Sequence, residues 1–244
     1  MKLFKLYICF IIISGCNSNI NKKKTEIEKY SIDTLIVSKN IEINNEPDSY
    51  ENLVDTLKIE DKLFTIIQND PRSKNQMNLA ILNSKKDTIY IHDGYATNGF
   101  EIEDFDKDGI LDIRLYQITN TGGISELIMF DKSNSIFRPI INFENFPEPT
   151  KIEKSDLWYS YHRSGCADIN WGSELFKIVN YKAIEIGDIE GIGCEGENIN
   201  GIFVYRVSGN KKTKMYSEIR KPGYYNDKWD FIEHYWNKNY YKFE

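Results

Sequence analysis

The residues with the clearest chemistry lie in the run 104–112, which reads DFDKDGILD. Alternating aspartates turn their carboxylates toward one hard cation, and a glycine permits the sharp turn that closes such a loop. Ca²⁺ takes roughly six to eight oxygen ligands, so four carboxylates, one backbone carbonyl and water would suffice. The sequence therefore predicts a calcium site with these ligands: Asp104, Asp106, Asp108, the carbonyl of Ile110, and Asp112.

The acidic run has two alternative interpretations, an EF-hand and a turn without a cation. An EF-hand requires a bidentate glutamate at loop position twelve, where this chain has Leu115. The flanking residues Phe100, Ile102, Ile113 and Leu115 alternate with polar ones, as in strands rather than helices. An acidic turn without a cation is the remaining alternative, and it would place four mutually repelling carboxylates close together.

A strand, the loop D-x-D-x-D-G-x-x-D and a second strand resemble the FG-GAP calcium blade of integrin α-subunit propellers. The run 104–114, DFDKDGILDIR, is still more similar to related bacterial exported proteins. The resemblance covers residues 99–138 and implies that the four aspartates are ligands. It also implies that the blade continues through turns at 121–123 and 131–134 to Phe137. This chain has one such loop rather than several, and it lacks clear Phe-Gly and Gly-Ala-Pro signatures.

The N-terminus indicates export. Lys2 and Lys5 precede an apolar stretch over residues 6–13, which Ser14, Gly15 and Cys16 follow. This order is typical of a signal peptide, and the stretch is too short to span a bilayer. The run 13–16 resembles the lipobox of bacterial lipoproteins, which implies that residues 1–15 are removed and that Cys16 is lipidated. A plain signal peptide with an incidental cysteine is the alternative.

The polar segment after the anchor predicts a flexible tether over residues 16–50, followed by a folded body over residues 51–244. In one large group of Gram-negative bacteria, an acidic cluster just after the lipidated cysteine marks export to the cell surface. The segment 17–19, Asn-Ser-Asn, lacks such a cluster. The expected location is therefore the outer membrane, facing the periplasm, with the cell surface as the alternative.

The body has the pattern of short strands separated by turns rich in Gly, Asn, Asp and Ser. This pattern predicts an all-β fold, a propeller-like or sandwich arrangement of antiparallel hairpins. Helical spacing of Trp229, Ile232, Tyr235 and Trp236 predicts one short helix over residues 227–238. The predicted strands cover residues 63–67, 77–82, 88–92, 127–130, 157–161, 175–179, 183–186 and 202–207.

Two cysteines remain in the body, Cys166 and Cys194. In an oxidising envelope an even pair usually forms a disulfide, and two buried thiols are the alternative. The segment 158–171 is rich in aromatic residues and could be a recognition surface formed by Trp158, Tyr161 and Arg163, or could belong to the core.

Other patterns predict no catalytic site. Ser160, His162 and Asp168 have neither a nucleophile elbow nor a zinc signature beside them. The run G-x-G-x-x-G at 191–196 precedes a turn and a strand, whereas a dinucleotide loop must open a helix.

Composition narrows the class of function. The 244 residues carry 31 basic and 37 acidic side chains, a net charge of -6, which disfavours a nucleic-acid partner. We therefore expect a non-enzymatic, calcium-stabilised lipoprotein that contacts the membrane through its lipid and binds a protein or glycan ligand in the envelope. Because relatives of the calcium-blade family include periplasmic inhibitors of lysozyme-like enzymes, the resemblance implies an inhibitor or immunity role. A hydrolase of envelope polymers, or an accessory enzyme, is the alternative.

Overall fold

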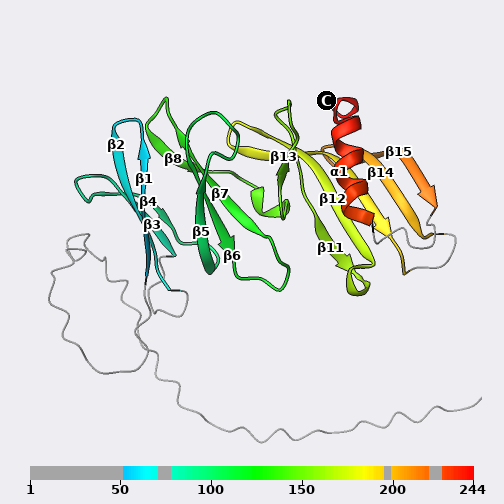
Figure 1. Ribbon diagram of the computed structural model, residues 1–244, viewed down its shortest axis with the longest axis horizontal. Coiled ribbons are helices and arrows are strands. Elements are labelled where there is room, and N and C mark those ends of the chain that lie inside the picture. The colour runs from blue at the N-terminus through cyan, green and yellow to red at the C-terminus, as the bar shows by residue number, and fades with distance from the viewer. Residues whose placement is uncertain (1–51, 71–77, 195–198, 220–226) are drawn as a thin grey trace, which may run out of the picture. The chain divides into compact units, whose positions relative to one another are not determined.

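The computed structural model describes residues 52–70, 78–194, 199–219 and 227–244 (Figure 1). All of them belong to one compact unit, Asp48–Glu244. The predicted signal peptide, the predicted lipidation site Cys16 and the predicted tether lie outside the described residues. No helix within the described ranges is long and apolar enough to cross a bilayer.

The described residues form fifteen strands in three sheets, and every strand pairing within a sheet is antiparallel. The N-terminal sheet has the order β1-β2-β3-β4: β1 Leu53–Ile59, β2 Lys62–Gln68, β3 Leu79–Leu82 and β4 Thr88–His92. The middle sheet has the order β5-β6-β7-β8: β5 Thr97–Glu103, β6 Asp112–Gln117, β7 Ser125–Asp131 and β8 Ile136–Pro139.

The C-terminal sheet is the largest, with the order β15-β14-β13-β12-β10-β9, and β11 also pairs with β12. Its strands are β9 Thr150–Lys151, β10 Trp158–Tyr159, β11 His162–Gly165, β12 Asn170–Val179, β13 Lys182–Ile192, β14 Gly201–Ser208 and β15 Lys211–Ile219. The helical elements are η2 Phe143–Asn145, η3 Cys166–Asp168, α1 Lys228–Asn239 and η5 Tyr240–Lys242. The predicted all-β fold is confirmed as a sandwich-like arrangement of sheets, and the short C-terminal helix is confirmed as α1.

The N-terminal and middle sheets share one apolar core. In β2 the side chains of Phe64 and Ile66 are buried while the residues between them are more exposed, as the period of two in a strand requires. The Phe64 ring packs at 5.8 Å from Phe130 of β7 and at 5.1 Å from Phe137 of β8, measured between centroids. These aromatic contacts hold the two four-stranded sheets together.

A second core joins the middle sheet to the C-terminal sheet through η2. Phe105, which lies inside the acidic loop, stacks on Trp158 of β10 with centroids 5.5 Å apart and planes 9° apart. Trp158 in turn stacks on Phe176 of β12. The acidic loop is therefore anchored to a packed aromatic cluster by the residue between its first two aspartates.

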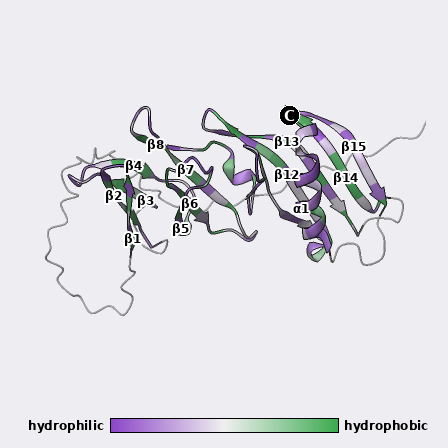
Figure 2. Ribbon diagram, turned by 45° about the horizontal axis from the view of Figure 1, so that its top comes forward, coloured by the Kyte–Doolittle hydropathy of each residue, from purple (hydrophilic) through white to green (hydrophobic). Residues whose placement is uncertain are grey.

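The helix α1 packs on one face of the C-terminal sheet (Figure 1). Its Trp236 is fully buried, and the indole Nε1–H donates to Ser173 Oγ of β12 at 2.8 Å. Gly187 of β13 makes this close packing possible, because a Cβ there would lie 3.0 Å from the Trp236 ring and 2.8 Å from Phe243. Most of α1 is hydrophilic (Figure 2), so a few large side chains carry its attachment.

Strand β15 had no counterpart among the predicted strands, and it is the longest strand that the apolar pattern missed. It reads KKTKMYSEI, and all but one of its residues are exposed. It lies at the end of the strand order, so it pairs only with β14 among the described strands. An edge strand that packs little of its surface needs no apolar alternation, which removes the signal used for the other strands. The predicted strand 157–161 is also shorter than expected, since β10 contains only Trp158 and Tyr159.

Candidate metal centre

The acidic loop connects β5 to β6, and the pairing of Glu103 with Asp112 closes its base. Two residues within the loop have positive φ, Lys107 at 68° and Gly109 at 88°. Glycine adopts this conformation at little cost, which explains its place at the turn. The two strands are therefore joined by a tight loop that folds back on itself.

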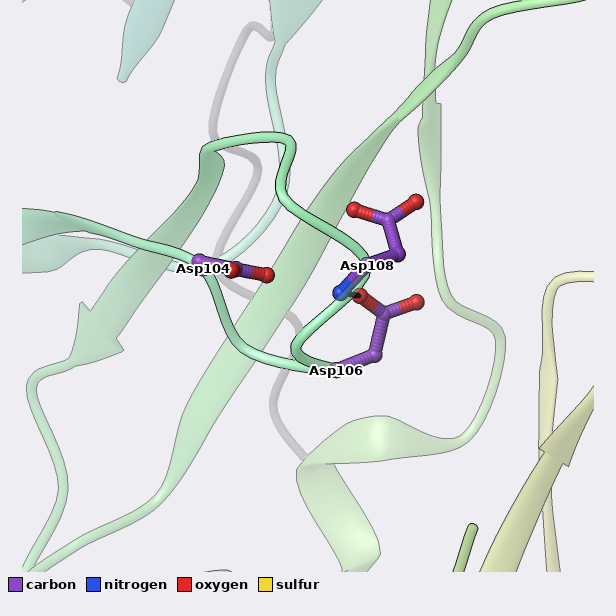
Figure 3. Close-up of side chains that lie close together, drawn as sticks. All are labelled: Asp104, Asp106 and Asp108. Carbon is purple, nitrogen blue, oxygen red and sulfur yellow. Dashed lines mark hydrogen bonds between the residues drawn. The ribbon is translucent and has the colours of Figure 1, made fainter.

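The side chains of Asp104, Asp106 and Asp108 converge in this loop (Figure 3). One carboxylate oxygen from each lies within 4.8 Å of the others. The N–H of Asp108 donates to Asp106 Oδ1 at 3.1 Å, and the N–H of Gly109 donates to Asp104 Oδ2 at 3.2 Å. These backbone hydrogen bonds orient the carboxylates toward the interior of the loop.

Two features of the loop, one at Asp104 and one at Asp106, favour a bound cation. Asp104 Oδ1 is inaccessible to solvent and has no hydrogen-bond partner in the described part of the chain. Burial raises the pKa of Asp106, and the nearby Asp108 carboxylate raises it further. A buried carboxylate oxygen without a donor is costly, and a cation would remove that cost.

The predicted ligands Asp112 and Ile110 lie beside this group in different environments. Asp112 is only 2 % exposed, and its Oδ2 accepts a hydrogen bond from the N–H of Phe105 at 3.3 Å. Burial, followed by repulsion from Asp106, raises the pKa of Asp112 to about 8. Its carboxylate is not part of the converging set. The N–H of Ile110 donates to Asp108 Oδ1 at 2.7 Å.

The residues present fit a hard divalent cation. Three converging carboxylates are oxygen ligands of the kind that Ca²⁺ prefers, and the unpartnered Asp104 Oδ1 is a free lone-pair donor. A bound ion would supply charge balance and would fix the loop that carries Phe105.

Two of the three residues of the predicted aromatic recognition surface are buried. Trp158 is 3 % exposed within the aromatic cluster described above, and Tyr161 is 7 % exposed against Trp229 of α1. Both therefore belong to the core, which was the alternative for this segment. Arg163 of β11 is exposed. Large aromatic side chains bury the most apolar area, so their burial between the sheets and the helix stabilises the fold more than exposure on a binding surface would.

The structure joins Cys166 and Cys194 in a disulfide, with their Cα atoms 6.4 Å apart. The bond ties η3 to the residues that follow β13. The backbone φ is positive at Cys166, Ala167 and Asp168, at 52°, 51° and 73°. Asp168 accepts hydrogen bonds from Tyr161 and from Lys228 at the start of α1, so the turn is held from three sides.

Ser160, His162 and Asp168 do not form a triad. Asp168 pairs with Lys228, whereas His162 pairs with Glu174 of β12, Nε2 to Oε1 at 2.7 Å. Ser160 is fully buried, donates to Glu174 Oε2 and accepts from the Glu174 N–H at 3.0 Å. The Glu174 carboxylate is therefore held between a serine and a histidine.

This pairing predicts a pH-dependent contribution to stability. Its hydrogen bond to Glu174 raises the pKa of His162 to about 9 from an ordinary 6.5. A histidine whose pKa is higher in the folded than in the unfolded state stabilises the fold fully when the pH is below the unfolded-state pKa. This stabilisation is lost as the pH rises through the folded-state pKa. We expect Glu174→Gln to lower the melting temperature by about 3–12 °C at pH 6, because a charged hydrogen bond contributes about 1.5–3 kcal/mol. At pH 10 the loss should be much smaller.

Thermal melts at both pH values check this expectation. Glu153→Gln, which makes the same charge change at an exposed residue, is the control. An equal loss at pH 6 and pH 10 for Glu174→Gln would show that the effect does not arise from the histidine.

Charged residues on β13 and β15 were missed by the sequence analysis. Asp188 and Glu190 of β13 lie two residues apart and therefore share a face, and both contact Lys212 of β15. The alternation of acidic residues along 188–190 could have indicated this face. Because β15 was not predicted, the lysine could not be placed beside them.

Comparisons with known proteins add little to this description. No protein-family model and no curated protein matches the chain. Among solved structures, the chain is similar to one described as "Structure of a Xanthomonas Type IV Secretion System related protein". The two share 11 % identity with a TM-score of 0.42, over 68 % of this chain and 98 % of that one. A likeness at this level does not assign a function.

Proposed function

We propose that this protein is a lipid-anchored, calcium-stabilised binding protein of the bacterial envelope and is not an enzyme. The observation that carries the proposal is the loop in which Asp104, Asp106 and Asp108 converge around a buried carboxylate oxygen without a donor. An ion bound there fixes the hairpin between β5 and β6 and, through Phe105, the contact of this hairpin with the C-terminal sheet. The sheets then serve as a rigid scaffold for recognition of an envelope protein or glycan.

The inhibitor or immunity role is the most specific form of this proposal. It is tested by capture from an envelope extract, with the full chain as bait. The capture is done once in about 1 mM calcium, which saturates a site of moderate affinity, and once in EGTA. We expect an envelope-degrading enzyme to be retained in calcium and lost in EGTA. The double variant Asp104→Asn with Asp108→Asn should fail to retain the enzyme in calcium, as the native chain fails to retain it in EGTA. Retention of the same partner under all conditions would contradict a role for calcium.

The lipid anchor has a separate test. Replacing Cys16 with Ala removes the acceptor sulfur, and several acyl chains at about 0.8 kcal/mol per buried methylene make the native anchor firm. On fractionation, we expect the Cys16→Ala protein in the soluble envelope fraction and the native protein in the membrane fraction. Cys9→Ala, in the segment predicted to be removed, is the matched control. A Cys16→Ala protein that stays in the membrane would refute lipidation at this residue.

One observation favours the hydrolase as a second candidate. Asp188, Glu174 and His162 line the same cavity, and burial raises the pKa of Asp188 in spite of its ion pair with Lys212. A carboxyl group with a raised pKa is a candidate general acid. In the structure, however, both ring nitrogens of His162 are within hydrogen-bond distance of other groups, Arg163 O and Glu174 Oε1. Release of soluble fragments from cell-wall polymer by the native chain, and not by Asp188→Asn, would establish this candidate.

A further inference from the structure

The face of the C-terminal sheet opposite α1 contains a cavity of about 340 Å³. Ser173 points to α1, so its neighbours Gly172 and Glu174 point to the opposite face. The missing Cβ of Gly172 makes room for the His162 ring, whose Nε2 would clash with a Cβ there. The volume is at the lower end of the range of about 300–1,000 Å³ that is usual for small-ligand sites.

Three carboxylates line this cavity, those of Glu174, Asp188 and Glu190. Glu174 and Asp188 are directly paired across β12 and β13. Asp188 is only 3 % exposed, and Glu190 is partly exposed at the rim. The nearby Glu185 also has a raised pKa, from burial first and then from Glu174 and Glu190. The lining of the cavity therefore carries three carboxylates against two cationic groups, those of His162 and Lys212.

A cation from this chain already occupies part of the cavity. The Lys212 ammonium reaches from the edge strand β15 across β14, donates to Asp188 Oδ2, and donates to Glu190 Oε1 at 3.0 Å. Its side chain is 47 % exposed and lies over the Tyr205 ring, with Nζ 5.7 Å from the centroid. A half-exposed lysine on an edge strand can leave this position without disturbing the core, whereas Asp188 cannot.

The other pair in the cavity is neutral overall and is fixed. Glu174 is held by Ser160 and His162, and the imidazolium of His162 balances its charge. Among the described residues, Asp188 and Glu190 both form their ion pairs with Lys212, so two carboxylates share one ammonium. A second donor-rich cation at this place would therefore be attracted, or would replace the lysine.

The arrangement fits an organic cation better than a metal ion. A metal requires ligand atoms that converge on one point, and among the described residues only Asp104, Asp106 and Asp108 converge in that way. Carboxylates that are spread along a cavity wall suit the separated N–H donors of a guanidinium group, which binds carboxylates in a planar, bidentate manner.

We propose that this cavity binds the guanidinium group of an arginine side chain on a partner protein, with Asp188 and Glu190 as acceptors and Lys212 as the displaceable internal cation. The inference rests on the proposed binding function and gives the chemistry of the partner. Tyr205 and Phe203, adjacent on β14 and each beneath a lysine, extend the face that an arginine-bearing segment would cover.

Calorimetry on the full chain purified in detergent tests the proposal, with a blocked pentapeptide containing one arginine as the probe. The same peptide with citrulline has nearly the same shape and no charge. We expect the arginine peptide to bind at least about tenfold more tightly than the citrulline peptide, since one charged hydrogen-bonded pair is lost. Asp188→Asn should weaken binding by a similar factor, and Lys212→Met should strengthen it several-fold by removing the competitor.

Two matched variants control for net charge. Asp156→Asn changes an exposed aspartate, and Lys211→Met changes the lysine that precedes Lys212. Neither should alter binding of the arginine peptide. If Asp188→Asn fails to fold, Glu190→Gln at the rim gives the same comparison. Equal binding of both peptides, or no difference between Lys212→Met and Lys211→Met, would overturn the proposal.

Binding of spermidine distinguishes an arginine on a partner protein from a free polyamine as the source of the organic cation. Tighter binding of spermidine than of the arginine peptide would replace the protein partner by a free polyamine and overturn the proposal. The proposed function fails independently, because it depends on retention of an envelope partner and on calcium. Retention of a partner by Asp188→Asn would refute the arginine cavity alone.

Discussion

Addition of calcium to the metal-free protein will raise its melting temperature by about 5–10 °C. Three converging carboxylates with a donor-free oxygen repel one another when no ion is bound, so the folded state gains from the ion and the unfolded chain does not. A ligand at about 100 times its Kd contributes about 2.7 kcal/mol, and each kcal/mol shifts the melting temperature of a domain of this size by about 2–4 °C. Thermal melts in EGTA and in excess calcium give the measurement.

Asp104→Asn combined with Asp108→Asn should abolish the calcium-dependent shift. In EGTA this variant should melt no lower than the native chain, because it also removes repulsion. Asp87→Asn with Asp93→Asn, two exposed aspartates of the β3–β4 hairpin and the turn after it, is the charge-matched control and should keep the full shift. If the native chain has the same melting temperature in EGTA and in calcium, the loop does not bind calcium in a way that stabilises the fold.

The second large effect concerns the disulfide. Replacing Cys166 and Cys194 together with Ser should destabilise the protein by about 3–4 kcal/mol on the chain-entropy model, because the bond closes a loop with a sequence separation of 28. The expected fall in melting temperature is about 6–16 °C. The turn at 166–168 has positive φ at each residue, so the bond also helps to hold a backbone conformation that is unfavourable for side-chain-bearing residues.

Melts of the native protein with and without a reducing agent should reproduce the difference between the native chain and the double variant. The reducing agent should leave the double variant unchanged. A single Cys166→Ser variant should lose as much as the double one. If the double variant has the same melting temperature as the native chain, the bond does not constrain the unfolded state of this protein.

Much of the local structure could be read from the sequence. The alternation of apolar residues predicts strands such as 63–67 and 88–92, which lie within β2 and β4. The spacing of Trp229, Ile232 and Trp236 predicts α1, in which Ile232 and Trp236 are buried. Both patterns are local, because the period of a strand or helix fixes which side chains share a face. The convergence of Asp104, Asp106 and Asp108 is local for the same reason, since all three lie in one short loop.

Contacts between distant segments required the tertiary structure. The sequence left open whether Trp158 and Tyr161 were core or surface, and the packing of Phe105, Phe176 and Trp229 against them placed both in the core. An aromatic side chain is suited to either environment, so its type does not decide between them.

The largest difference lies in the chemistry. The sequence by itself determined the acidic loop, because its aspartates are neighbours along the chain. The cavity between Glu174, Asp188 and Lys212 exists only because β12, β13 and β15 carry these residues to one face of the C-terminal sheet. Strand pairing brings together residues that are far apart in sequence, and an exposed edge strand such as β15 has no apolar pattern that predicts its place.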